Sequence, residues 1–125
     1  MLTSWGVRGP GLTDGQVVTL VGGLGLDLLR RHAGGSAYGP IHPAHVRIDE
    51  ARRPWLVPVP PPAAWTPHDD WVSLLRLGRL MGRGTWASTL TLQSVGRRSG
   101  QELLVWLLMQ RDAEPLPPAL FLDAG

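Results

Sequence analysis

The stretch HAGGSAYGPIHPAHVRIDEARRPWLVP, residues 32–58, decides the fold of this chain. It opens with a glycine pair, continues through a loop rich in histidine and proline, and ends in two short apolar runs. The runs 46–48 and 55–57 flank a polar turn, a pattern that predicts a small β-hairpin with a long turn. Pro58 ends any strand at this point, because proline lacks the N–H group that a strand ladder needs.

Helices are predicted on both sides of this stretch. Thr13 and Gln16 have the spacing of a capping box, and apolar residues follow at helical intervals, which predicts a helix over 14–32. Thr66 and Pro67 open a second helix, over 69–82, which is apolar on most sides and is therefore expected to be central. A third helix is expected over 99–110, whereas 83–97 favours neither helix nor strand. The predicted class is α+β, mainly α.

These elements, in this order, resemble the C-terminal lobe of a protein kinase, in a degenerate, pseudokinase form of the kind found in high-GC actinobacteria. In that family a helix leads into the loop H-G-D-x-x-P-x-N-V-L, a small hairpin, D-F-G and a buried helix that begins D-x-W-S-x-G. Gly39, Pro43 and Val46 match the loop frame. The resemblance implies a truncated C-lobe of three main helices and one β-hairpin over 13–115, with a loose segment at 1–12 and a Pro-rich tail at 116–125.

The resemblance also implies that the catalytic groups are missing. Pro40 stands at the position of the catalytic aspartate, His45 at that of the asparagine metal ligand, and Pro58 opens the segment that replaces D-F-G; His42 lies in the same degenerate loop. The sequence has no lysine and no glycine-rich loop for a nucleotide, both of which kinases need. We therefore expect no enzymatic activity and no cofactor. The residues before the first helix are too few for an N-terminal lobe, and the sequence leaves open whether the true start is earlier or a neighbouring chain supplies that lobe.

The resemblance implies two structural residues, and residue type suggests three interaction residues. Asp69 is expected to take the role of the family aspartate that holds the loop backbone, with Trp71 beside it in the buried helix. Without catalysis, the expected function is a pseudokinase-like interaction, scaffold or regulatory module with an unknown protein partner or a second copy of itself. Tyr38, Trp55 and Trp65 are the candidate contacts, because large aromatic residues contribute much of the binding energy at interfaces.

Composition leaves two alternatives open. All twelve basic residues are arginines, but the formal net charge is only +2 and the arginine pairs are scattered, which disfavours a nucleic-acid-binding regulator. His42 and His45 are three residues apart and are the alternative metal site, although we expect both rings to bond to loop backbone instead. Without cysteine there is no disulfide or zinc-thiolate site. The apolar stretch 17–29 is too short to span a bilayer, so we expect a cytoplasmic chain without membrane insertion.

Overall fold

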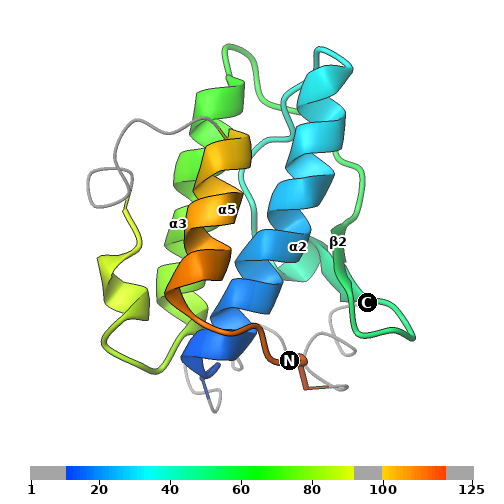
Figure 1. Ribbon diagram of the computed structural model, residues 1–125. Helices are drawn as coiled ribbons and strands as arrows, with labels where there is room; N and C mark the ends of the chain where they lie inside the picture. The colour runs from blue at the N-terminus through cyan, green and yellow to red at the C-terminus, as the bar shows by residue number, and fades with distance from the viewer. Residues whose placement is uncertain (1–10, 92–99, 118–125) are drawn as a thin grey trace.

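The computed structural model describes residues 11–91 and 100–117. It confirms the mainly helical α+β class, and Figure 1 shows α2 between the helices α3 and α5 on one side and the strand β2 on the other. The elements in chain order are α2 (Asp14–Ala33), the 3-10 turn η1 (Pro43–His45), β1 (Val46–Ile48), β2 (Pro54–Leu56), α3 (Pro67–Met81), the 3-10 turn η2 (Ala87–Thr89) and α5 (Gly100–Gln110).

The helix α2 begins at the predicted capping box and ends one residue later than expected. The Gln16 N–H donates to Thr13 Oγ1 at 3.1 Å, and the Thr13 N–H donates to Gln16 Oε1 at 3.0 Å. Two glycines in the middle of this helix allow close packing. A Cβ on Gly23 would lie 2.6 Å from Pro54 of β2, and a Cβ on Gly25 would lie 2.5 Å from Leu104 of α5.

The helix α3 begins at the predicted cap Thr66 with Pro67 in its first turn, two residues before the range 69–82 assigned to it. Its buried residues, among them Leu74, Leu75 and Leu77, pack toward α2. The close approach of the two helices depends on Gly78, where a Cβ would lie 2.9 Å from Val21. The expected central helix is therefore confirmed, although Leu80 on its outer face is exposed.

The hairpin is antiparallel, with Val46 opposite Leu56 and Ile48 opposite Pro54. Its second strand starts one residue before the predicted position. Pro54 is tolerated there as the first residue of an edge strand, and the Val57 N–H donates instead to the His45 carbonyl at 2.8 Å. The hairpin therefore closes directly onto the end of η1.

Residues near both ends of the described chain are buried in the core, which the sequence analysis did not predict. Leu12, assigned to the loose segment 1–12, and Leu116, assigned to the tail 116–125, are both fully buried. Leu12 bonds to the end of α3, since its N–H donates to the Met81 carbonyl at 2.7 Å. Residues 1–10, 92–99 and 118–125, which include the end of the undecided stretch 83–97, lie outside the described residues. Within the described part, no helix has both the length and the apolar character to cross a membrane.

Candidate functional site

The fully buried carboxylate of Asp70, in the first turn of α3, is the centre of the degenerate loop region. Its Oδ2 accepts hydrogen bonds from the Tyr38 N–H at 2.7 Å and contacts His32 Nε2 at 2.7 Å. Its Oδ1 accepts from the Gly39 N–H at 2.9 Å and from the Trp65 indole Nε1 at 2.7 Å. One side chain thus holds the end of α2, the loop, the segment before α3 and α3 itself together.

The bonding around Asp70 is what makes its burial tolerable. A carboxylate loses much solvation energy in an apolar interior, and hydrogen bonds to the charged form are needed to offset that loss. Hydrogen bonds to charged groups contribute about 1.5–3 kcal/mol each, more than neutral ones. His32 can in addition form an ion pair with Asp70 when it is protonated, and its ring meets Trp71 edge-on, with centroids 5.8 Å apart.

Further contacts fix the loop on both sides of this carboxylate. The Ile41 N–H donates to Ser73 Oγ of α3 at 2.8 Å, and the Tyr38 hydroxyl donates to the Val57 carbonyl at 2.6 Å. The guanidinium of Arg31 lies 4.9 Å from the centre of the Tyr38 ring. Burial raises the pKa of Tyr38 to about 12, because the buried phenolate would be poorly solvated. The loop backbone is therefore held at three successive points, by Asp70 twice and by Ser73 once.

The hairpin that follows the loop is fixed to α2 through Leu56. The Leu56 N–H donates to Asp27 Oδ2 at 3.0 Å, and the Leu56 carbonyl accepts from Arg31 Nη2 at 3.1 Å. These two side chains pair with the N–H and the carbonyl of Leu56 on the edge of β2 that faces away from β1, so the edge is covered at this residue.

The four degenerate positions differ in exposure. Pro40, His42 and Pro58 are exposed, whereas His45 is half-buried. His42 behaves as expected, because its Nδ1 accepts from the Ala44 N–H at 3.0 Å. The ring of His45 does not: its Nδ1 is buried without a hydrogen-bond partner, and only the backbone of His45 contributes to the loop. None of the four positions offers a carboxylate.

Asp69 does not hold the loop, contrary to the sequence prediction. Its Oδ2 instead accepts from the Thr66 N–H at 2.9 Å and from the Thr66 hydroxyl at 3.0 Å, and these bonds lower its pKa. Asp70 carries out the expected role. The spacing Thr66-x-x-Asp69 is a capping box that commits the earlier carboxylate. With Asp70 as the aspartate of D-x-W-S, Ser73 takes the place of the serine, although Val72 then stands at the tryptophan position. Both signals were present in the sequence.

The three aromatic residues expected at an interface are placed differently from one another. Tyr38 is fully buried, so the prediction that it contacts a partner is wrong. Trp65 is half-buried, with its indole N–H committed to Asp70. Trp55 is 45% exposed on the hairpin and remains available, while Trp71 is buried and lies against the start of α5, as a structural residue should.

The structure gives little support to either alternative function, the nucleic-acid-binding regulator or the metal site. Arg31 points inward to Leu56 and Tyr38, and Arg97 and Arg98 lie outside the described residues, so convergence of the arginine pairs on one face is not observed. The rings of His42 and His45 lie 6.1 Å apart, and no third histidine or acidic residue in the described ranges joins them as a metal ligand.

The site as a whole is a loop that is held rigidly from within and that presents prolines and one imidazole to solvent. Neither a known protein family, nor a curated protein, nor a solved structure matches this chain.

Proposed function

We propose that this chain is a non-catalytic protein-interaction module, with a scaffolding or regulatory role and a frame like the C-terminal lobe of a protein kinase. The observation that carries the proposal is the Asp70 carboxylate, which accepts from two successive N–H groups of the loop and ties them to the end of α2 and to the segment before α3. In the family that the sequence resembles, the aspartate of the buried helix holds the catalytic-loop backbone, and Asp70 makes contacts of that type. Because this loop is held firmly by hydrogen bonds but lacks the catalytic aspartate, its role in the proposal is to bind a partner.

The proposed absence of catalysis rests on what phosphoryl transfer requires. The reaction needs a carboxylate to orient the attacking hydroxyl, ligands for magnesium and a positive charge on the phosphates. Pro40 and Pro58 stand where the resemblance places the two aspartates, and the sequence contains no lysine. Removing a single group of this kind typically costs several kcal/mol of transition-state stabilisation, roughly 3–4 kcal/mol.

The proposed contact surface combines the loop with the proline segment that follows the hairpin. Pro40 and His42 are exposed on the loop, and Pro60, Pro61 and Pro62 are exposed on the segment 60–62. The two parts are adjacent, because a Cβ on Gly39 would lie 3.2 Å from Pro62. Prolines lose little conformational freedom when a partner binds, so more of the contact energy remains as affinity.

Affinity capture from the source cells with matched variants tests the interaction. His42→Glu adds a charge to the proposed surface while keeping an acceptor for the Ala44 N–H, and His68→Glu makes the same change at an exposed position outside it. Proteins retained by the His68→Glu variant and lost with His42→Glu would support the proposal. Equal capture by both variants would contradict it, and sedimentation velocity of the pure protein shows whether the partner is a second copy.

Nucleotide binding tests the other half of the proposal. We expect a titration with ATP and magnesium to leave the melting temperature unchanged, because binding to the folded state alone would raise it. A saturable, dose-dependent increase would show a functional nucleotide site and would refute a purely non-catalytic role.

A further inference from the structure

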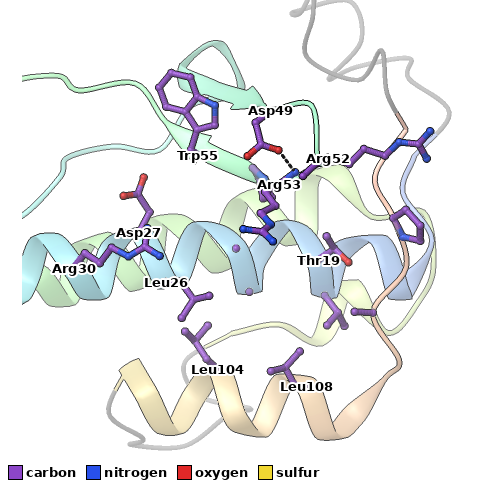
Figure 2. Close-up of a pocket in the computed structure, with 17 residues that line it drawn as sticks. Thr19, Leu26, Asp27, Arg30, Asp49, Arg52, Arg53, Trp55, Leu104 and Leu108 are labelled. Atoms are coloured by element: carbon purple, nitrogen blue, oxygen red, sulfur yellow. Dashed lines mark hydrogen bonds between the residues drawn. The ribbon is translucent and has the colours of Figure 1, made fainter.

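We call residues 38–41, which Asp70 and Ser73 hold, the anchored loop. A cavity of about 830 Å³ lies away from this loop, against α2, the hairpin and α5. Its floor is the exposed face of α2, and its walls are the hairpin turn and α5 (Figure 2). We call this cavity the α2–α5 groove. Its volume falls within the roughly 300–1,000 Å³ of small-molecule sites.

One glycine of α2, Gly22, lines this groove without being needed for close packing. Gly23 and Gly25 are needed for close packing, but a Cβ on Gly22 would have no atom within 4 Å. A glycine inside a helix costs about 1 kcal/mol relative to alanine. Gly22 therefore carries that cost without a packing requirement among the described residues, and what it provides is an open floor in the groove that it lines.

The groove combines apolar walls with unused positive charge. Leu26, Leu104 and Leu108 lie together on its α5 side in Figure 2, and Leu26 and Leu108 are more than half exposed. Arg30 and Arg53 also line it, and neither guanidinium has a hydrogen bond, ion pair or ring contact within the described part of the chain. Figure 2 shows Arg53 extending from the hairpin turn toward α2.

The two carboxylates of the groove are already engaged. Asp27 accepts from the Leu56 N–H at 3.0 Å and lies 3.7 Å from Arg31 Nε, while Asp49 accepts from the Arg53 N–H at 2.9 Å. Their bonds shape the hairpin turn and its attachment to α2. The lining carries three arginines against these two aspartates, so the net charge that faces a ligand is positive.

We propose that the α2–α5 groove binds a small anionic amphiphile, a carboxylate or phosphate monoester carried on an apolar chain. Its apolar body lies against Leu26, Leu104 and Leu108, and its head group pairs with the guanidinium of Arg53. Guanidinium binds carboxylate and phosphate well because its planar N–H groups match two oxygens of either. The proposal goes beyond the interaction function and does not depend on it.

Isothermal titration calorimetry with four probes of equal chain length tests the head-group chemistry. The probes are decanoate, decyl phosphate, decyltrimethylammonium and decanol, all kept below their micelle concentrations. We expect saturable one-to-one binding of the two anions, and the stronger of the two identifies the head group. Binding of the cation or the alcohol as tight as that of the anions would overturn the proposal, as would binding of none of the four probes.

Three variants test the place of binding. Gly22→Leu fills the groove without a clash at the Cβ and should abolish anion binding while the circular dichroism spectrum is retained. Arg53→Gln should weaken anion binding about tenfold or more, the loss of one charge-assisted hydrogen bond. Arg76→Gln, exposed on α3 and outside the groove, should bind like the unaltered protein. If Gly22→Leu fails to fold, Arg53→Gln and Arg76→Gln still decide the matter, and equal affinity of these two variants would refute the site.

Discussion

Replacing the buried Asp70 by asparagine should destabilise the whole molecule far more than the same change at the adjacent Asp69. The two residues are neighbours in the sequence and both accept hydrogen bonds at the start of α3. Asp70 is fully buried and joins four segments, whereas Asp69 only caps its own helix. The pair is thus a matched comparison between a tertiary anchor and a local cap.

The magnitude follows from the donors that lose their acceptor. In Asp70→Asn, an NH₂ group in place of Oδ1 would face two donors, the Gly39 N–H and the Trp65 indole N–H. In place of Oδ2 it would face the Tyr38 N–H but could donate to the ring nitrogen of His32. Each buried donor left without a partner costs about 1–3 kcal/mol. One or two such donors give a loss of about 1–6 kcal/mol, a large fraction of the roughly 5–15 kcal/mol that keeps a domain folded.

Urea unfolding followed by far-ultraviolet circular dichroism measures the difference directly. We expect Asp70→Asn to be unfolded or to unfold at much lower urea, and Asp69→Asn to shift the midpoint only slightly. Hydrogen exchange then locates the loss, since the Tyr38 and Gly39 amides should lose protection in the Asp70 variant alone. Equal midpoints for the two variants would refute the view that one carboxylate holds the loop.

Three further predictions concern separate parts of the fold. Because the pKa of Tyr38 is raised to about 12, its contribution to stability is complete below its ordinary pKa and is lost as the pH rises from about 10 to 12, by about 3 kcal/mol; unfolding of Tyr38→Phe over that range should lack this component. Gly22→Ala should stabilise by about 0.5–1 kcal/mol through helix propensity, whereas Gly23→Ala should destabilise, because its Cβ would lie 2.6 Å from Pro54; thermal melts of both variants with the same sign of change would contradict this contrast. Leu74→Asp should unfold the chain, since it places a charge at a fully buried position, whereas His45→Ala should fold normally and give an unchanged circular dichroism spectrum; mild, equal effects would show that α3 is not central.

Short sequence patterns predicted those helices and strands whose limits depend on residues close together in the sequence. The capping box at Thr13 located the start of α2, and Thr66 with Pro67 located the start of α3 to within a few residues. The hairpin was found because two apolar runs flank a polar turn. In each case the signal and the structure involve residues that are close together in the sequence.

The anchored loop could be predicted only in part, because its contacts are distant in the sequence. The bonds from His32, Tyr38 and Gly39 to Asp70 span more than thirty residues each. Tyr38 follows a Gly-rich stretch, which suggests that its side chain is exposed. In the structure its hydroxyl instead donates to the Val57 carbonyl at the end of the hairpin. Leu116 stands alone among prolines, so no periodicity marks it as core.

The helix α2 connects the anchored loop with the α2–α5 groove and explains why its glycines are tolerated. Three glycines would weaken an isolated helix by about 1 kcal/mol each, but α2 is fastened at both ends. At its start the Thr13 hydroxyl donates to Glu114 at 2.8 Å, and at its end His32 contacts Asp70 at 2.7 Å. Tertiary contacts of this kind supply most helix stability in proteins. Because contacts at both ends stabilise α2, its middle tolerates glycine, and Gly22 can leave the floor of the α2–α5 groove open.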